Sequence, residues 1–321
     1  AHLAVNEEAE HIIATTDGIL SALVALLRFG TEKGKQQAAA ALENLSVSNG
    51  LAVCRQDGVI EGLTQLVLNT QDSKGMETAA AVLQNLALIP ECRRSLQTPP
   101  LFRGLVNILL FGSSKAKEDS AAAIGNLAAS EEIVDEAMHT PSLLDGLVEL
   151  LLTGSDRGKS DAATAIGNLS IRDDMRSTIL EHPGLLGGLD SMLNSLSERH
   201  KGEAAFCIQN LSICSIPQKI RIARYGRIVD GLVNLVSRPN LHSQYQEDAS
   251  SALLNLLVGC SENKKSAIRI PNFMSGTIYC MRYGSDRSQE NATALLQNLA
   301  FNDHEIRLFI IGYPEALKFL G

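Results

Sequence analysis

The stretch from Asp161 to Ser170 reads Asp-Ala-Ala-Thr-Ala-Ile-Gly-Asn-Leu-Ser, and close copies of it return along the whole chain. The copies align on one asparagine each, at Asn44, Asn85, Asn126, Asn168, Asn210, Asn255 and Asn298. Subtraction of these numbers gives intervals of 41, 41, 42, 42, 45 and 43 residues. Helical repeats with a period in this range stack into a solenoid in which each unit packs mainly on its neighbours. The sequence therefore predicts an all-α fold.

Each copy follows one plan, which consists of a short helix, a break at glycine or proline, an apolar second helix and a longer inner helix that ends near the asparagine. This plan predicts seven three-helix repeats and a partial eighth, forming a single domain over residues 1–321. The repeats are expected at approximately 1–46, 47–87, 88–128, 129–170, 171–212, 213–257, 258–300 and 301–321. The first helices of repeats one and four are expected from Val5 to Thr16 and from Ile133 to Met138.

Helix-capping residues recur thirteen positions before each asparagine, at Thr31, Asp72, Ser113, Ser155, Ser197, His242 and Ser285. Six of these seven are good N-cap residues, because their side-chain oxygens accept from backbone N–H groups of the first helical turn. The preceding residue is glycine in four repeats, at Gly30, Gly112, Gly154 and Gly284. We expect these glycines to be left-handed residues that end the second helix. The longer sixth interval predicts an enlarged turn from Ser237 to Ser243.

The composition narrows the class of protein and its partners. The formal net charge is -8 and the isoelectric point is near 5.4, which argues against a nucleic-acid or anionic-membrane surface and favours a basic partner. The sequence contains no run of the about 18 to 20 apolar residues that a membrane span needs. The first residues lack the pattern of a signal peptide. Because the chain starts without methionine and ends within a repeat, we expect it to be a piece of a longer protein.

The cysteines indicate an intracellular protein. Six of them are spread through predicted helices without a C-x-x-C pair, at Cys54, Cys92, Cys207, Cys214, Cys260 and Cys280. This distribution predicts reduced core residues and a cytoplasmic, or also nuclear, location.

No motif for catalysis or for metal binding appears. The seven histidines fall at predicted helix ends or turns, without carboxylates or cysteines at metal-ligand spacing. No G-x-S-x-G, P-loop or H-E-x-x-H sequence is present, and the glycine-rich Gly184 to Gly188 follows no strand. We therefore expect a protein that is not an enzyme and that carries neither a metal nor a cofactor.

The whole repeat pattern resembles that of armadillo repeat proteins, whose fold is a right-handed α-solenoid superhelix. Within that family, the stretch from Gly154 to Ile171 is most similar to the armadillo domains of plant-type U-box ubiquitin ligases, and the stretch from Gly30 to Ser46 is similar as well. The chain contains no U-box. The resemblance to ligases thus implies a substrate-recognition arm without the ligase centre.

The resemblance also implies a role for the seven asparagines, since in armadillo proteins this residue binds the backbone of an extended peptide in the concave groove. A carboxamide both donates and accepts, so it can bind a peptide whatever its side chains. Alternatively, some of these amides cap backbone groups of adjacent turns. Nuclear import receptors of the family have tryptophan four residues earlier. This chain has no tryptophan, which argues against import-signal recognition, and Phe206 is the one aromatic residue in that register, either as a groove anchor or as core.

A row of mostly basic residues stands eleven positions before the asparagines and includes Lys115, Arg157 and Arg199. Eleven helical steps return to nearly the same bearing, so this row shares the asparagine face. In one hypothesis these residues form ion pairs with carboxylates four positions on, at Asp119, Asp161 and Glu203, and with neighbouring repeats. In the other they form a basic rim that receives an acidic or phosphorylated segment.

Together these observations predict a non-catalytic scaffold that binds an extended or helical segment of another protein in its groove. Three alternatives remain open: the substrate-recognition domain of a U-box ligase, an autoinhibitory or ligand-sensing domain of a larger enzyme, and a cytoskeletal adaptor. The sequence indicates no oligomeric state.

Overall fold

A computed structural model describes residues 12–13, 16, 18–70, 72–129, 137–239, 242–301 and 303–318. Across these residues the chain folds into twenty helices and contains no strand, as predicted. Most of the helix expected from Val5 to Thr16, and residues 133–136 of the one expected to end at Met138, lie outside the described residues. No helix among the described residues is both long enough and apolar enough to cross a lipid bilayer.

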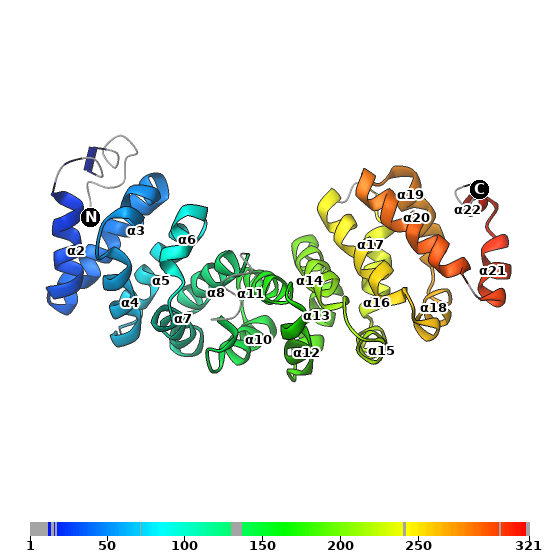
Figure 1. Cartoon of the computed structure of the whole chain (residues 1–321), viewed down its shortest axis with the longest axis horizontal. Helices are drawn as coiled ribbons and strands as arrows, with labels where there is room; N and C mark the ends of the chain where they lie inside the picture. The colour runs from blue at the N-terminus through cyan, green and yellow to red at the C-terminus, as the bar shows by residue number, and fades with distance from the viewer. Residues whose placement is uncertain are drawn as a thin grey trace. The chain divides into compact units, whose positions relative to one another are not determined.

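The described helices follow the predicted order of first, second and inner helix along the chain (Figure 1). The inner helices are α3 (Glu32–Arg55), α5 (Ser73–Ala87), α8 (Ser114–Ala128), α11 (Asp156–Leu169), α14 (Glu198–Leu211), α17 (Ser243–Leu257) and α20 (Asp286–Ala300). The second helices are α2 (Ile19–Phe29), α4 (Val59–Asn69), α7 (Pro99–Phe111), α10 (Leu143–Thr153), α13 (Leu185–Leu193), α16 (Ile228–Val236), α19 (Phe273–Tyr283) and α22 (Pro314–Leu317). The short first helices are α6 (Pro90–Leu96), α12 (Asp173–Glu181), α15 (Ile216–Arg224), α18 (Ser261–Ala267) and α21 (His304–Ile311).

One expected break is absent. The inner helix of the first repeat runs on into the short helix of the second, so that both form α3, with a kink at Asn49 (φ −126°, ψ 30°). The connection between α16 and α17 spans residues 237–242, whereas only residues 112–113 join α7 to α8, and residues 240 and 241 of the predicted enlarged turn lie outside the described residues.

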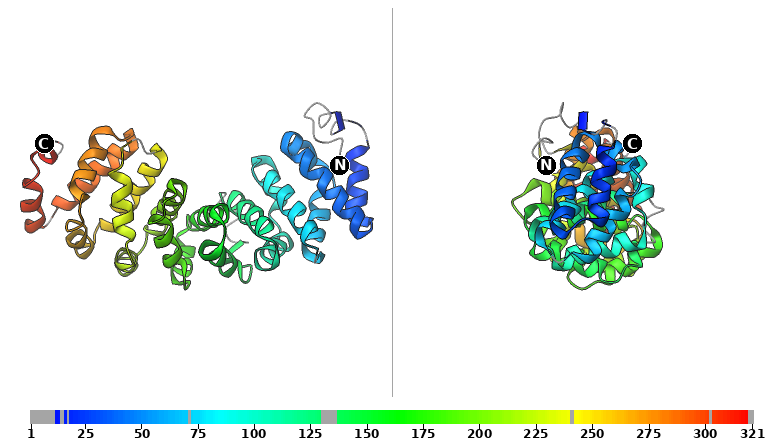
Figure 2. Two further views of the ribbon diagram at one scale, coloured as in Figure 1. Left: turned by 180° about the vertical axis from the view of Figure 1, so that it is seen from behind. Right: turned by 90° about the vertical axis from the view of Figure 1, so that its left-hand side faces the viewer.

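The chain divides into two compact units, Ala1–Ala165 and Ile166–Gly321, with the boundary inside α11. In the first unit α3, α5 and α8 pack side by side, and α2, α4, α7 and α10 form a second layer. In the second unit α14, α17 and α20 pack side by side, with α13, α16 and α19 as their second layer (Figure 2). The prediction that residues 1–321 form a single domain stays a prediction.

Small residues allow the inner helices to approach closely. Ala38, Ala39, Ala79 and Ala80 are fully buried. A Cβ atom added at Gly125 of α8 would lie 3.3 Å from the Cα atom of Ala165 in α11. Side chains of Leu or Ile at such positions would force the helices apart, because packed interiors leave no room for added methylene groups.

The predicted N-caps are confirmed in all six repeats with a capping side chain. Each side-chain oxygen accepts from the backbone N–H three residues further on, at 3.2 Å for Thr31, 2.8 Å for Asp72, 3.3 Å for Ser113, 3.1 Å for Ser155, 3.3 Å for Ser197 and 3.3 Å for Ser285. His242 makes no side-chain cap. These bonds fix where each inner helix begins.

The expectation of left-handed glycines before these caps is wrong. The four residues are extended, with φ between −67° and −72° at Gly30, Gly112, Gly154 and Gly284. Glycine is needed there for a steric reason. A Cβ atom would lie 2.4 Å from the Leu26 carbonyl oxygen at Gly30 and 2.6 Å from the Ile108 carbonyl oxygen at Gly112. The left-handed residues instead precede the second helices, for example Gly18, Gly58 and Gly184.

All six cysteines are free thiols. Cys92, Cys207, Cys260 and Cys280 are buried, and Cys54 and Cys214 are half-buried. Burial raises the pKa of Cys280 to about 11, so this thiol is protonated at neutral pH.

Candidate functional site

All seven predicted asparagines are half-buried on inner helices. Those from Asn85 onward lie in the last turn of their helix, and Asn44 lies within α3. The helix axis and the N-cap set their bearing, which is why a fixed distance from the cap returns the same face in each repeat.

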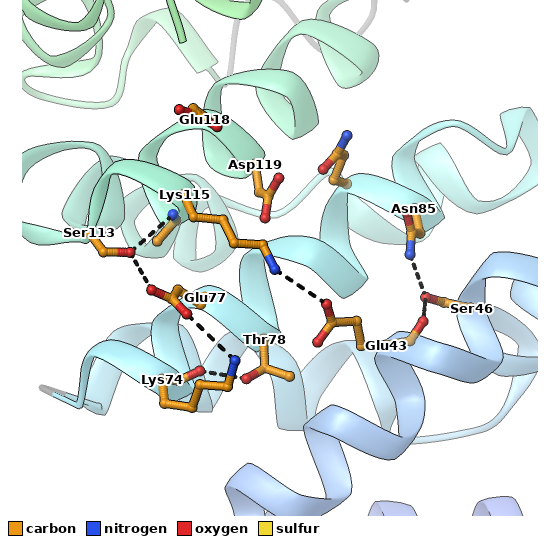
Figure 3. A network of polar contacts seen from close by, with 12 residues as sticks. Glu43, Ser46, Lys74, Glu77, Thr78, Asn85, Ser113, Lys115, Glu118 and Asp119 are labelled. Atoms are coloured by element: carbon orange, nitrogen blue, oxygen red, sulfur yellow. Dashed lines mark hydrogen bonds and ion pairs between the residues drawn. The ribbon is translucent and has the colours of Figure 1, made fainter. Parts of the chain in front are cut away.

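Three of the amides are held by the preceding repeat. The Nδ2 atom of Asn85 donates to Ser46 Oγ at 2.9 Å, that of Asn210 donates to the Gly167 carbonyl at 2.9 Å, and that of Asn255 donates to the Gln209 carbonyl at 3.2 Å. Figure 3 shows the first of these bonds. The adjacent-turn contacts considered above are therefore present at these three positions. Their Oδ1 atoms accept no hydrogen bond from the described residues, which leaves an acceptor for a ligand.

Asn44, Asn126 and Asn298 differ from this pattern. Asn44 and Asn126 make no side-chain hydrogen bond to any described residue. Asn298 has a buried Oδ1 atom that accepts no hydrogen bond within that part of the chain. A buried carbonyl oxygen without a donor lowers stability, so it favours any group that supplies one.

Arg157 of α11 joins three inner helices of the first unit. Its Nη2 atom donates to Asp119 Oδ1 at 2.6 Å and to Gln84 Oε1 at 3.1 Å, and its Nε atom lies 3.2 Å from Asp161 Oδ2. Asp119 is on α8 and Gln84 is on α5. A planar guanidinium with five donors suits such a junction, whereas a lysine ammonium could not span it.

Lys115 and Arg199 also have carboxylate partners. Arg199 lies 4.0 Å from Glu203, as expected for an i,i+4 pair. The expected partner of Lys115 is wrong, because its Nζ atom lies 3.9 Å from Glu43, two repeats earlier, rather than against Asp119 (Figure 3). Asp119 pairs instead with Arg157 of the following repeat. All three cations of the proposed rim are thus paired in the way that an ion-pair ladder requires.

Nearby cations offset only part of the effect of burial on the carboxylates of this face. Burial raises the pKa of Glu43 although Lys115 and Lys74 act against it, and burial raises the pKa of Asp119 although Arg157 acts against it. Burial alone would lower the pKa of Arg157, but Asp119, Asp161 and Glu118 together raise it. In the second unit, burial raises the pKa of Asp248 to about 6. Desolvation therefore outweighs ion pairing at these carboxylates.

A second inter-repeat contact was not anticipated from the sequence. The hydroxyl groups of three capping serines donate to a glutamate of the preceding repeat, from Ser113 to Glu77 at 2.6 Å, from Ser155 to Glu118 at 2.5 Å and from Ser285 to Glu247 at 2.6 Å. Each glutamate stands eight residues before its asparagine. That recurrence was the signal that could have revealed the contact. Each of these serines therefore both caps its own helix and joins it to the previous repeat, and Figure 3 shows the bond from Ser113 to Glu77.

Phe206 is half-buried on α14 and covers a glycine of the preceding inner helix. A Cβ atom added at Gly167 would lie 2.7 Å from Phe206 Cε1. In the same way, Tyr245 of α17 covers Gly202, where an added Cβ atom would lie 2.1 Å from Tyr245 Cδ1. Both rings thus fill inter-repeat space, and the anchor role of Phe206 stays a prediction. Nowhere in the described ranges do three histidine, cysteine or acidic side chains gather as a metal site.

Comparison with known proteins identifies the class of fold. No family model matches the sequence, and a search of curated proteins found no match. Among solved structures, an engineered protein aligns with a TM-score of 0.79 at 23% identity, over 92% of this chain and 72% of its own. A designed armadillo repeat protein in complex with the peptide (KR)4 aligns at 0.64 and 23% identity, over 74% of this chain and 98% of its own. Computationally designed armadillo repeat proteins for modular peptide recognition align at 0.65 and 23% identity, over 74% and 99%. The fold is therefore that of an armadillo-type repeat solenoid.

Proposed function

We propose that the asparagine-bearing face of the inner helices binds an extended or helical segment of another protein. The observation that carries this proposal is the state of the amides at Asn85, Asn210 and Asn255. In each, the nitrogen is fixed by the preceding repeat while the oxygen accepts no bond from the described residues. A fixed amide has little conformational entropy to lose when it accepts from a ligand N–H.

The spacing of the inner helices supports an extended ligand. Packed helices lie about 8 to 10 Å apart, and three residues of extended chain span about 10 Å. One amide in each repeat would therefore meet roughly every third residue of a peptide. A single such bond contributes about 1 kcal/mol, so useful affinity needs several repeats. Designed armadillo repeat proteins with this fold include one in complex with a peptide, which is consistent with the proposal.

The test is a peptide selected for binding from a displayed random library and then titrated against variants. Asn126→Ala is expected to weaken binding about fivefold, the equivalent of one hydrogen bond, with an unchanged melting temperature. Asn69→Ala is the matched control, since among the described residues its amide bonds only to Gln65, which also lies on the second helix α4. If Asn44→Ala, Asn126→Ala and Asn85→Ala all bind the peptide as the unaltered protein does, the asparagine face is not the site.

The narrower hypotheses concern the protein around this domain. The likeness to U-box ligases rests on the stretch from Gly154 to Ile171, and none of the solved structures reported above connects the chain to ubiquitin transfer. A U-box in the same full-length protein would establish a ligase role. A thermal shift with a panel of metabolites would instead reveal a ligand-sensing domain. The proposal itself assigns no catalytic step and no cofactor.

A further inference from the structure

An apolar residue follows each asparagine by three positions. The row consists of Val47, Leu88, Ala129, Ile171, Ile213, Val258 and Phe301. In the structure these side chains do not enter the core, and the exposed fractions are 75% for Val47, 51% for Ile213 and 39% for Val258. Single exposed apolar residues are ordinary. A position that is apolar in every repeat and exposed in most of them instead indicates an interaction surface.

Two consecutive members of this row border a cavity in the second unit. Ile213 and Val258 line a space of about 510 Å³ together with Leu254, Asn255, Arg176 and Lys219. We call it the Ile213 cavity. Its volume is within the range of about 300 to 1,000 Å³ that ligand pockets occupy. The cavity lies where α14 and α17 end and where α12 and α15 begin.

The cations of this cavity are fixed by helix ends. Arg176 is buried and forms an ion pair with Asp173, which also lines the cavity. It also donates to the carbonyl oxygens of Ser170 at 2.8 Å and of Ile213 at 3.0 Å. Lys219 donates to the Val258 carbonyl at 3.1 Å. A cation at a helix C-terminus is stabilised by the carbonyl dipoles. An ammonium has three donors, and Lys219 makes one hydrogen bond to the described residues, so two donors remain for a ligand.

The sequence around this cavity is basic, although the chain as a whole is acidic. Residues 204–229 contain four cations, Lys219, Arg221, Arg224 and Arg227, and no carboxylate, in a chain of net charge -8. Arg224 pairs with Glu262 at 2.6 Å. Arg221 and Arg227 are exposed and form no ion pair with a described residue. By contrast, Lys115, Arg157 and Arg199 are all paired. Arg221 of α15 and Arg227 just after it therefore carry positive charge that no described carboxylate pairs with.

We propose that the Ile213 cavity binds an acidic segment of another protein, which inserts one apolar side chain between Ile213 and Val258 and places carboxylates near Lys219. The apolar border accounts for the side chain, and Lys219, which lines the cavity and forms no ion pair with a described residue, accounts for the charge. The Oδ1 atom of Asn255, which accepts no bond from the described residues, is available to a backbone N–H of the segment. This surface goes beyond the asparagine face proposed above and shares only Asn255 with it.

The test uses a fluorescein-labelled peptide of seven residues with a central leucine and three acidic residues on each side. Binding is measured by fluorescence anisotropy at low and at moderate salt. We expect saturable binding that weakens at least tenfold when glutamine replaces the acidic residues, and at least tenfold when alanine replaces the leucine. Added salt is also expected to weaken it, because screening reduces charge attraction.

The protein variants separate this cavity from the other face. Ile213→Ser and Lys219→Met are expected to weaken binding at least fivefold, while Val47→Ser, at the same register of the first unit, and Asn126→Ala leave it unchanged. Ile213 is half-exposed, so its variant is expected to keep the melting temperature even if Lys219→Met lowers it. Absence of peptide binding at millimolar concentration, or equal binding by Ile213→Ser, overturns the proposal. Sedimentation with phosphatidylserine vesicles but no peptide binding would show a membrane surface instead and would also overturn it.

Discussion

Arg157 and Asp119 form an ion pair between successive inner helices, with Nη2 and Oδ1 2.6 Å apart. The side chain of Asp119 is only 3% exposed, whereas that of Arg157 is 40% exposed. The pair therefore supplies a buried carboxylate with its main counter-charge, and at the same time ties two repeats together.

Arg157→Met is expected to lower the free energy of unfolding by about 2 kcal/mol, because it leaves the Asp119 carboxylate buried without its main counter-charge. Arg199→Met is the matched control. Its pair with Glu203 is long, at 4.0 Å, and the arginine is largely exposed, so a loss of at most about 0.5 kcal/mol is expected. Urea denaturation followed by circular dichroism measures both. Equal losses in the two variants would show that the buried pair has no special weight.

The cost of Arg157→Met is expected to depend on pH. Burial raises the pKa of Asp119 even with Arg157 present, and removal of the guanidinium raises it further. A carboxyl group with a higher pKa in the folded state favours folding when protonated, so its penalty is absent at low pH and appears as the pH rises through the folded-state pKa. The variant should therefore approach the unaltered protein at pH 4 and fall furthest behind it at pH 7.5. A difference that stays constant between these two pH values would contradict this account.

Asp248 offers a test in the second unit. Burial raises its pKa to about 6, with the Gln244 amide and Arg287 acting against this and Glu247 and Glu203 adding to it. Its contribution to stability is thus full below about pH 4 and is lost as the pH rises through about 6. Asp248→Asn should gain about 1 kcal/mol over the unaltered protein at pH 7.5, since solvent screens part of the effect, and nothing at pH 4. The check is a series of urea midpoints across this range; a gain at pH 4 of the same size would refute the assignment.

The double role of the capping serines predicts a larger loss than capping alone. Ser113→Ala removes the bond from the Ala116 N–H and the bond to Glu77, and we expect a loss of about 1 to 2 kcal/mol. The neighbouring Ser114 is exposed, so Ser114→Ala is expected to change little. Thermal unfolding of the two variants compares them directly. A neutral Ser113→Ala would mean that water replaces both bonds.

The steric role of Gly112 predicts that no side chain is tolerated there. Gly112→Ala and Gly112→Asn are both expected to lose about 1 to 3 kcal/mol, because a Cβ atom would lie 2.6 Å from the Ile108 carbonyl oxygen. At Gly18 the residue is left-handed (φ 83°) and a Cβ atom would meet nothing within 4 Å. Gly18→Asn should therefore cost less than Gly18→Ala, since asparagine adopts this conformation more readily. Tolerance of asparagine at Gly112 would restore the left-handed interpretation.

These examples also show what the sequence could predict. Repeat period, helix order and the N-caps were all predictable, because each depends on residues within one turn or on a spacing that recurs. The reason for glycine at position 112 was not, since a steric clash and a positive φ require the same residue type. The partner of Lys115 was missed for a different reason. Glu43 lies two repeats away, and only the stacking of three helices brings it into reach.

The bonds from serine to glutamate were predictable only in part. Glu77, Glu118 and Glu247 recur at one register, and so do their serine partners, but a single inner helix gives no hint that the two registers meet. The asparagines show the same limit. Their position was predictable from one repeat, whereas the bonds that fix the amides of Asn85, Asn210 and Asn255 come from the previous repeat.

The contact between Gly202 and Tyr245 has a consequence for how such a chain can be altered. Gly202 stands where other repeats have the glutamate that receives a serine, and the ring of Tyr245 fills the space. The fifth repeat therefore fits only a successor that brings a ring, and the second, third and sixth fit one that brings a hydroxyl. Duplication, deletion or grafting of units in this protein therefore has to cut within a repeat. Only such a cut keeps together the two sides of each interface between adjacent repeats, which have to match.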